Sequence, residues 1–435
     1  MSRLVVRGAR IVDPSQNLDE VCDLVLSDGV VESVGNVLGG GGGIDKFKLD
    51  DADVIDAKGL VAVPGFIDIH VHLREPGFEY KETIASGSHA AVAGGFTAVA
   101  AMANTDPPND SAAVTEFILR KAAQADKARV YPIGSITKGM KGAELSEMGE
   151  MVEAGAVAVS DDGLPVDDVN VMRRAMEYAT VFDIPVIEHC ETPALHPGGV
   201  MNEGYWSTAL GLRGIPRASE EISVDRNVVL AEMTGARFHV AHLSTSGALR
   251  RVKEAKARGL VVTCEVTPHH LVLTDESVKS YDTAAKMKPP LVTESDRDAL
   301  LQGLADGTVD AIATDHAPHH LDEKSEDFDH APFGIVGLET AVSLCLDRLV
   351  RPGVISLSRM VELLSSGPAR ILGVPGGTLA VGAPADVTLL DLERRGRVDP
   401  DTFVSRGRNT PFAGWELTGS AATTIVSGRV VWTRE

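Results

Sequence analysis

Eight short apolar runs recur through the middle of this chain, and they constrain its fold more than any other feature. Each run follows the previous one after roughly 20 to 50 residues, and amphipathic, helix-like stretches lie between them. The runs are 60–63 continuing to 67–69, 97–102, 130–133, 156–159, 185–187, 238–241, 260–264 and 309–313. Eight strand–helix units of this kind predict an α/β protein built on a (β/α)8 TIM barrel, here over residues 63–375.

Side chains that can bind metal ions follow most of these runs. In a barrel the carboxyl ends of the strands form one rim, and active sites are built on that rim. A barrel without a site would place turn-forming residues at these positions, so we predict an active site there. The residues are His70, His72, Asn104, Asp161, Asp162, His189, His242, His269, His270, Asp315 and His316.

Both ends of the chain have the pattern of short strands separated by turns. The β-like runs are 4–6, 9–12, 23–27, 385–391 and 422–431. Gly39 to Gly43 are five consecutive glycines, which predict a loose surface loop. Two β-rich ends around an α/β middle predict that residues 1–62 and 376–435 form one small β-sandwich domain.

Composition excludes several kinds of partner. The net charge of −21 argues against nucleic acid, because phosphate binding needs clustered Lys and Arg. No apolar run approaches the roughly 18 residues of a membrane span, and the first residues lack the apolar core of a signal peptide. The four cysteines form no CxxC pair, which favours reduced thiols and a cytoplasmic protein. An anionic small substrate stays compatible, since one local arginine can dominate a pocket.

The histidines at the predicted rim indicate a metal site. His70 and His72 are two residues apart on a strand, so their imidazoles point to the same face. This pair alone is weak evidence, but His189, His242 and Asp315 converge on the same rim. Four histidines and one aspartate exceed the three protein ligands of a typical catalytic zinc. The set therefore predicts two zinc ions per subunit, joined by a bridging anion.

The bridge between the two ions has more than one candidate. No lysine ends the fourth run, where Ser160, Asp161 and Asp162 follow Val159. Strand alternation lets only one of these aspartates face inward, and local geometry favours Asp162 over Asp161. Lys138 and Lys141, as carboxylated lysines on a glycine-rich loop, are the next candidates.

Five blocks of sequence resemble a known family. They are 70–77 (HVHLREPG), 102–108 (MANTDPP), 267–270 (TPHH), 313–319 (ATDHAPH) and 331–334 (APFG). Together they resemble the signature of the type I bacterial dihydroorotases, which belong to the amidohydrolase superfamily. The match covers essentially the whole chain. The first and fourth blocks are specific, whereas the terminal strands are shared with many amidohydrolases.

This resemblance implies a role for each matching residue. One zinc would be held by His70, His72, Asp162 and Asp315, and the second by Asp162, His189 and His242. Asp162 is the implied bridge. The substrate carboxylate would be bound by Arg74, Asn104 and His319, and the pyrimidine ring by the backbone of Phe333 and Gly334.

The implied reaction is the reversible cyclisation of N-carbamoyl-L-aspartate to (S)-dihydroorotate and water, in de novo pyrimidine (UMP) biosynthesis. A hydroxide bridging both zincs would attack the ring amide, since metal binding lowers the pKa of water from about 16 toward 7. Asp315 would accept a proton and then deliver it to the leaving nitrogen, as general base and then general acid. Arg74 suits a carboxylate because its planar fork can bind both oxygens.

One position departs from the family pattern. Lys288 stands before the double proline where an asparagine is usual, and we count it among the substrate-binding residues. Asparagine both donates and accepts hydrogen bonds, whereas lysine only donates and adds a positive charge. The change bears on dihydroorotate affinity and leaves the metal ligands unaltered.

The sequence is also compatible with two other functions. An allantoinase or hydantoinase would share the barrel and the metals, but such enzymes usually have a lysine bridge and lack an arginine at position 74. A non-catalytic scaffold for aspartate carbamoyltransferase would have a broken ligand set, whereas every ligand position is filled here. The sequence is also compatible with a homo-oligomer and with binding to aspartate carbamoyltransferase. The charged stretch 320–330 fits either a lid or an ordinary solvated loop.

Overall fold

The computed structural model describes residues 3–35 and 52–434, so the predicted loop at Gly39 to Gly43 lies outside the described residues. Eight parallel strands form a sheet in sequential order. They are β6 (Phe66–Val71), β7 (Phe96–Ala101), β8 (Arg129–Gly134), β9 (Ala158–Val159), β10 (Val186–Glu188), β13 (Phe238–Val240), β14 (Val262–Val266) and β15 (Ala311–Ile312). A parallel bridge between Val71 and His316 brings the two edges together. The predicted barrel is confirmed, because each of the eight runs overlaps one of these strands.

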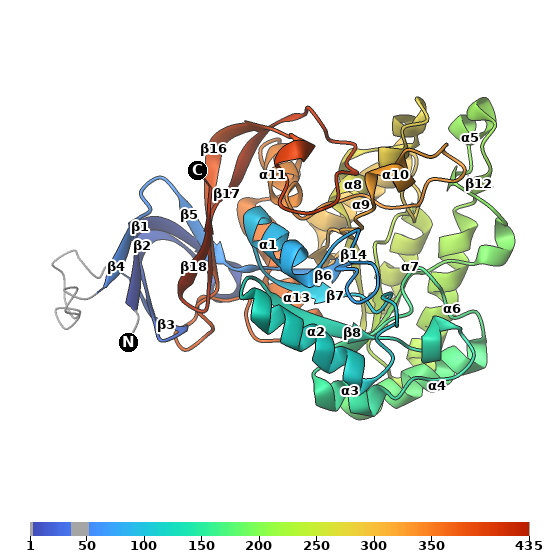
Figure 1. Cartoon of the computed structure of the whole chain (residues 1–435), viewed down its shortest axis with the longest axis horizontal. Coiled ribbons are helices and arrows are strands. Elements are labelled where there is room, and N and C mark those ends of the chain that lie inside the picture. Colours follow the sequence, from blue (N-terminus) through green and yellow to red (C-terminus); the bar gives the residue numbers. More distant parts are fainter. Residues whose placement is uncertain (1–2, 36–51, 435) are drawn as a thin grey trace.

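Helices surround this sheet (Figure 1), and their buried apolar side chains belong to the same core as those of the strands. The main ones are α1 (Ile84–Gly94), α2 (Ala112–Ala125), α3 (Met148–Ala154), α4 (Val169–Ala179), α6 (Ala218–Thr234), α7 (Ser246–Ala257), α9 (Glu294–Asp306), α12 (Leu357–Leu364) and α13 (Ser366–Leu372). Local sequence sets their limits. Thr83 and Ser86 form a reciprocal cap at the start of α1, and Gly95 ends that helix with a φ of 98°.

Strands from both ends of the chain share a second sheet, at the left of Figure 1. The path is β18 (Arg429–Thr433), β17 (Glu416–Val426), β16 (Val387–Arg397), β5 (Val61–Pro64), β1 (Arg3–Asp13), β2 (Leu18–Ser27) and β3 (Val30–Gly35), with β4 (Asp53–Asp56) paired to β1. Its inward side chains, including Ile11, Leu24, Val387 and Ile425, enclose a separate apolar core. The small β domain that accompanies the predicted barrel is therefore present, while its residue limits stay a prediction.

The expectation that residues 60–63 begin the first barrel strand is wrong. These residues lie in β5, which pairs with β1 and β16 of the second sheet. A continuous apolar run does not reveal which sheet buries it. The chain changes sheets at Gly65, where an added Cβ would lie 2.2 Å from the Thr97 hydroxyl oxygen. Pro64 and Gly65 thus separate two strands that look like one in the sequence.

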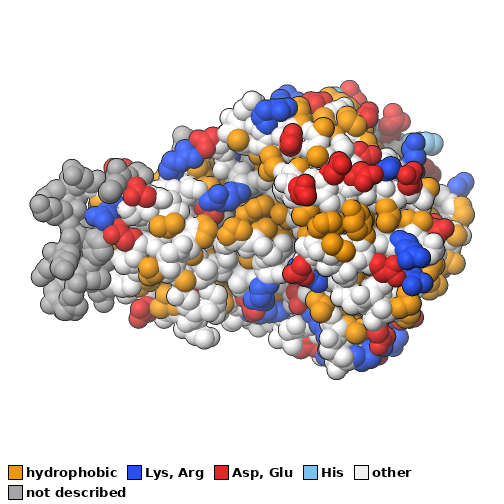
Figure 2. All heavy atoms as spheres, turned by 90° about the horizontal axis from the view of Figure 1, so that it is seen from below, with side chains coloured by type: hydrophobic (Ala, Val, Ile, Leu, Met, Phe, Trp, Pro, Cys, Tyr) orange, Lys and Arg blue, Asp and Glu red, His pale blue; other side chains and the backbone are white. Residues whose placement is uncertain are grey.

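The molecular surface mixes charges of both signs. On the face shown in Figure 2, basic side chains lie among acidic ones, and apolar side chains gather toward its centre. Among the described residues, no helix has the length and apolar character needed to cross a membrane.

Candidate metal centre

Six predicted metal ligands meet at the carboxyl ends of the barrel strands. His70 lies in β6, and the others follow a barrel strand within three residues. All six side chains are buried; they are His70, His72, Asp162, His189, His242 and Asp315. They form three overlapping groups of three residues whose ligand atoms lie within 4.8 Å of one another. The barrel rim therefore does bring these predicted residues together.

Asp162 lies at the centre of this cluster. Its Oδ1 is 3.4 Å from His70 Nε2 and 3.4 Å from His242 Nε2, and its Oδ2 is 3.5 Å from His72 Nε2. Asp315 Oδ1 lies 3.0 Å from His72 Nε2. His189 Nδ1 approaches His242 Nε2 to 2.9 Å, which adds the sixth side chain. One carboxylate thus contacts histidines from both of the ligand groups that the resemblance implies.

The cluster fits a metal site by the chemistry of its donor atoms. His70 Nε2 and Asp162 Oδ1 are buried, and neither has a hydrogen-bond partner in the described part of the chain. Buried polar atoms are rarely left without a partner unless they serve a ligand or an ion. Imidazole nitrogens and carboxylate oxygens converging on one point are the donor set that zinc and similar divalent ions prefer.

The electrostatics of the cluster favour a positive charge. Burial lowers the pKa of His70, but Asp162, Asp315 and Glu265 raise it well above its ordinary value. Conversely, burial raises the pKa of Asp162, while His70 and His242 together hold it well below the ordinary range. The carboxylates thus draw positive charge into a buried site, and a bound cation would supply that charge with the histidines neutral.

Glu265 supports the cluster and was not predicted from the sequence. This β14 residue places Oε1 2.7 Å from His70 Nδ1, and its Oε2 is 3.2 Å from His239 Nε2. Its Oε1 also accepts a hydrogen bond from the His242 backbone N–H at 3.2 Å. A carboxylate on the far nitrogen of a ligand histidine fixes the ring so that the other nitrogen faces the metal. A glutamate directly after the apolar residues of a predicted barrel strand was the available signal.

Asn104 holds His72, one of the predicted ligands, through its carbonyl oxygen. The Nδ1 of His72 lies 2.8 Å from Asn104 Oδ1, so the ring N–H donates to that oxygen and Nε2 faces Asp315. Its predicted contact with the substrate carboxylate would have to come from the amide nitrogen. In the part of the chain that the structure describes, that nitrogen makes no hydrogen bond.

The two adjacent aspartates after β9 point in different directions. Asp161 accepts hydrogen bonds from the backbone N–H groups of Ile136 (2.7 Å) and Thr137 (3.1 Å), and from the Thr137 hydroxyl. It therefore braces the loop after β8, whereas Asp162 enters the cluster. The alternative bridge Lys138 is exposed and pairs with Glu144 at 2.9 Å.

The predicted substrate residues Arg74, His319, Phe333 and Gly334 lie beside one another. Arg74 Nε donates to the Pro318 carbonyl at 3.2 Å, and its Nη2 is 3.4 Å from His319 Nε2. Burial lowers the pKa of Arg74 to about 10, so it remains a cation at neutral pH; Asp315 and Asp162 act in the opposite direction. His319 Nε2 lies 2.8 Å from the Phe333 carbonyl oxygen. Burial and the neighbouring Arg74 lower the pKa of His319 to about 2, so its ring is neutral.

Lys288 is engaged with a neighbouring carboxylate. Its Nζ lies 2.7 Å from Glu191 Oε2, and that oxygen is 3.4 Å from His189 Nε2. Burial raises the pKa of Glu191, but His189 and Lys288 outweigh this effect and hold it at about 2. Glu191 was not predicted as a site residue. It stands 97 positions from Lys288 in the sequence, so only the fold reveals the pair.

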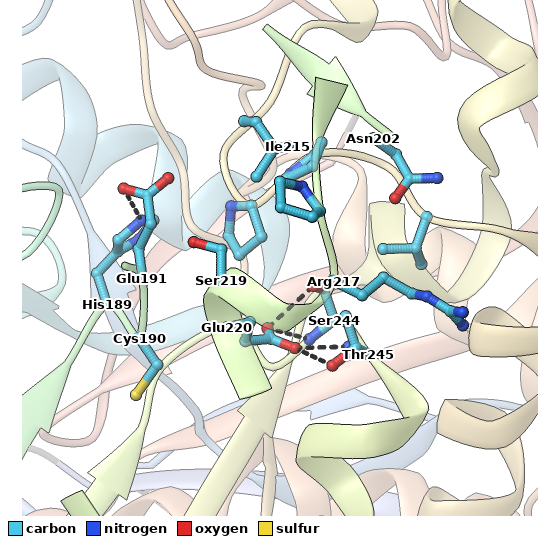
Figure 3. A pocket seen from close by; sticks show the side chains of 14 residues that line it. His189, Cys190, Glu191, Asn202, Ile215, Arg217, Ser219, Glu220, Ser244 and Thr245 are labelled. Carbon is cyan, nitrogen blue, oxygen red and sulfur yellow. Dashed lines mark hydrogen bonds and ion pairs between the residues drawn. The ribbon is translucent and has the colours of Figure 1, made fainter. Parts of the chain in front are cut away.

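Figure 3 shows a cavity beside His189 and Glu191. Its volume of about 20 Å³ holds about one water molecule and excludes a cyclic substrate. Beneath it, Glu220 of α6 accepts hydrogen bonds from the backbone and hydroxyl groups of Ser244 and Thr245 at 2.5–2.9 Å. Glu220 thereby secures the turn that follows His242.

Comparisons with known proteins first define the class. A protein-family model described as "Amidohydrolase family" matches residues 329–432. The solved structure of an L-hydantoinase (dihydropyrimidinase) from Arthrobacter aurescens superposes with a TM-score of 0.88 at 26% sequence identity. That alignment covers 99% of this chain and 96% of the other. Fold and sequence thus place the chain among the amidohydrolases.

Closer relatives define the family within that class. A model described as "Dihydro-orotase-like" matches residues 59–248. A protein named dihydroorotase from Syntrophotalea carbinolica is 53% identical over 430 residues, which is 99% of each chain. Another of that name from Geobacter metallireducens is 52% identical over 431 residues, covering 99% of this chain and 100% of the relative. The chain belongs to the dihydro-orotase-like family of amidohydrolases.

Proposed function

We propose that this chain is a dihydroorotase, which interconverts N-carbamoyl-L-aspartate and (S)-dihydroorotate with release or uptake of water. The observation that carries the proposal is the guanidinium of Arg74 beside a buried histidine–aspartate cluster. Dihydroorotate has a carboxylate and a ring amide, so a cation next to a metal centre suits both its binding and its hydrolysis. The relatives named dihydroorotase support this assignment over the full length of the chain.

The donor set suits two zinc ions that share Asp162. One ion would use His70, His72 and Asp315, and the other His189 and His242. When bound, such ions polarise a carbonyl and make water a nucleophile near neutral pH. The outer contacts of His70, His72 and His189 with Glu265, Asn104 and Glu191 would keep the ligand nitrogens aimed at the ions.

The chain's own groups would handle binding and proton transfer. Arg74 would bind the substrate carboxylate and hold the ring amide toward the cluster. In the hydrolytic direction, the Asp315 carboxylate would accept a proton from the attacking water and deliver it to the leaving ring nitrogen. Ring closure would use the same transfers in reverse.

Replacing Arg74 tests its role in binding. We expect Arg74→Ala to raise KM for dihydroorotate about 10- to 100-fold with a smaller change in kcat, because charge-assisted hydrogen bonds to the carboxylate contribute about 1.5–3 kcal/mol. Steady-state kinetics of the metal-loaded variant measure this. Arg120→Ala, at an exposed arginine of α2, is the control. An unchanged KM, or a loss confined to kcat, would contradict carboxylate binding by Arg74.

Replacing Lys288 shows whether its ammonium group stabilises the fold through Glu191 or binds the substrate. We expect Lys288→Asn to change KM less than about threefold and to lower the free energy of unfolding by about 1–3 kcal/mol, because Glu191 loses its ion pair. The double variant with Glu191→Gln should recover part of that loss. Urea unfolding and steady-state kinetics give both quantities. A tenfold rise in KM at unchanged stability would instead assign Lys288 to the substrate.

The direct test of the proposed function is an assay of the purified, zinc-loaded chain with dihydroorotate, allantoin and hydantoin in parallel. Turnover of dihydroorotate alone is the expected result. Turnover of hydantoin or allantoin in its place would identify another cyclic amidase. With two zincs bound and none of the three substrates hydrolysed, the scaffold alternative would replace the proposal unless added aspartate carbamoyltransferase restored activity. Binding to that transferase and a homo-oligomeric state stay predictions.

A further inference from the structure

Residues 319–334 connect two parts of the proposed substrate site. The segment begins at His319, includes the short helix α10 (Leu321–Lys324), and returns to Phe333 and Gly334. Its two ends meet, since His319 Nε2 lies 2.8 Å from the Phe333 carbonyl oxygen. A Cβ at Gly334 would fall 2.8 Å from the His319 ring, so the close approach requires glycine. The geometry of the site therefore depends on how this segment is held.

Lys324 holds the end of the segment from within. The residue is 8% exposed, and Nζ donates to the carbonyl oxygens of Pro332 at 2.9 Å and Gly334 at 3.2 Å. The Gly334 oxygen also accepts a hydrogen bond from Asn409 Nδ2 at 2.9 Å. Two side chains from different parts of the chain thus fix one peptide of the predicted substrate contact.

Lys286 holds the middle of the same segment. It is 2% exposed, and Nζ donates to the carbonyl oxygens of Phe328 at 2.6 Å and Asp329 at 3.1 Å. The ammonium group lies 4.6 Å from the centre of the Phe333 ring, within range of a cation–π contact. The Lys286 carbonyl accepts from the Gly334 N–H at 2.9 Å. Lys286 therefore touches the segment through both its side chain and its backbone.

These two lysines are unusual because they are buried and neither is in close contact with a carboxylate; Asp327, Asp329 and Asp282 act on them only from a distance. In the described part of the chain both ammonium groups donate to carbonyl oxygens and neither forms an ion pair. Burial, with a contribution from Lys286, lowers the pKa of Lys324 to about 7. Burying a cation is costly, and an apolar side chain would fill the same volume without that cost. The burial of both lysines is explained if their hydrogen bonds are needed to hold the backbone of residues 319–334.

We propose that Lys286 and Lys324 are positioning residues that hold residues 319–334 in place, so that His319, Phe333 and Gly334 stay beside Arg74. This inference rests on the proposed function, because it assigns a purpose to the substrate side of that site. Neither ammonium group contacts a metal-ligand residue of the cluster. The lysines act on the substrate through the backbone of the segment. The segment itself forms one side of the proposed substrate site.

The test compares Lys324→Met and Lys286→Met with Lys279→Met, an exposed lysine whose partner is Glu276. We expect KM for dihydroorotate to rise about tenfold or more in the first two variants, with kcat reduced less and zinc content unchanged, because small misplacements of binding groups can cost up to about 10²-fold. Backbone hydrogen exchange should increase in residues 319–334 and stay as in the parent elsewhere. Lys324→Arg, which keeps the charge and the donors, should recover part of the KM.

Several results would overturn the proposal. Parental KM and exchange in both methionine variants would show that the lysines are dispensable. Loss of zinc, or faster exchange spread over the barrel, would show a general role in folding. If a methionine variant does not fold, Lys324→Gln and Lys286→Gln keep a donor and are measured in the same way. The exchange measurement is independent of turnover, so a parent chain inactive on dihydroorotate would refute the proposed function while still testing the positioning role.

Discussion

Asp315→Asn is expected to lower kcat for dihydroorotate by about 10²- to 10⁴-fold, the range that general acid–base catalysis supplies. Asparagine keeps the shape of the side chain but cannot take up and return a proton. The carboxylate lies in the cluster, 3.0 Å from His72 Nε2, beside the groups that would hold the reacting atoms in the proposed mechanism. Single-turnover or steady-state kinetics in both directions measure the loss, and zinc analysis of the same samples shows whether the metal centre persists.

A carboxylate at the opposite end of the same strand provides the matched control. Asp310 precedes β15, and its Oδ2 lies 2.6 Å from Lys256 Nζ, away from the cluster. We expect Asp310→Asn to leave kcat within about twofold of the parent and to lower the free energy of unfolding by about 1–3 kcal/mol, because Oδ2 also accepts a hydrogen bond from the Cys264 backbone N–H at 2.8 Å. If Asp315→Asn kept both zinc and more than about a tenth of the parental kcat, Asp315 would not be the proton carrier and another group would have to fill that role.

The residues of the histidine–aspartate cluster could be predicted to lie together, because the barrel fold relates their sequence positions to one place in space. Parallel strands of a barrel end at the same rim, so a histidine or aspartate placed just after a strand lies near all the others. His189 and His242 are 53 positions apart, yet their ring nitrogens are 2.9 Å apart. The strand period of two explains why His70 and His72 face the same way. The same alternation favoured Asp162 over Asp161 in the sequence, although both residues lie just beyond the end of β9.

The supporting residues could not be predicted by the same rule. Glu265 lies inside β14 and reaches His70 across the barrel, a contact that depends on the packing of strands far apart in the sequence. Glu191 and Lys288 come from different loops. Lys286 and Lys324 look like ordinary solvated charges in the sequence, because lysines are seldom buried without a partner. Their surroundings, which decide their roles, are set only when the loops pack on the barrel.

The change of sheet between β5 and β6 was also not predicted from the sequence. Residues 60–69 are apolar enough for one strand, but β5 and β6 belong to different sheets. Hydrophobic periodicity reports that a segment is buried and does not report its neighbour. The dipeptide Pro64-Gly65 was the local sign of a break, since proline and glycine commonly interrupt regular strands.

Asp162→Asn is expected to remove bound zinc and, with it, activity. Asp162 belongs to two of the three ligand groups, so its loss weakens both proposed ion sites at once. Changes in outer contacts of metal ligands commonly cost about 10- to 100-fold in affinity, and loss of a shared direct ligand should cost at least as much. Zinc titration and metal analysis after dialysis measure the effect, and kcat should fall with the fraction of zinc lost.

Asp161→Asn is the matched control for Asp162→Asn, because it changes only the neighbouring carboxylate. Asp161 faces the loop at Ile136 and Thr137, where an amide has one acceptor oxygen in place of two. We expect parental zinc content with a free energy of unfolding lowered by about 1–3 kcal/mol, as for a buried hydrogen-bond network that loses an acceptor. Zinc loss in Asp161→Asn with retention in Asp162→Asn would reverse the assignment. Equal zinc loss in both would mean that the loop and the metal centre are coupled through the backbone that joins them.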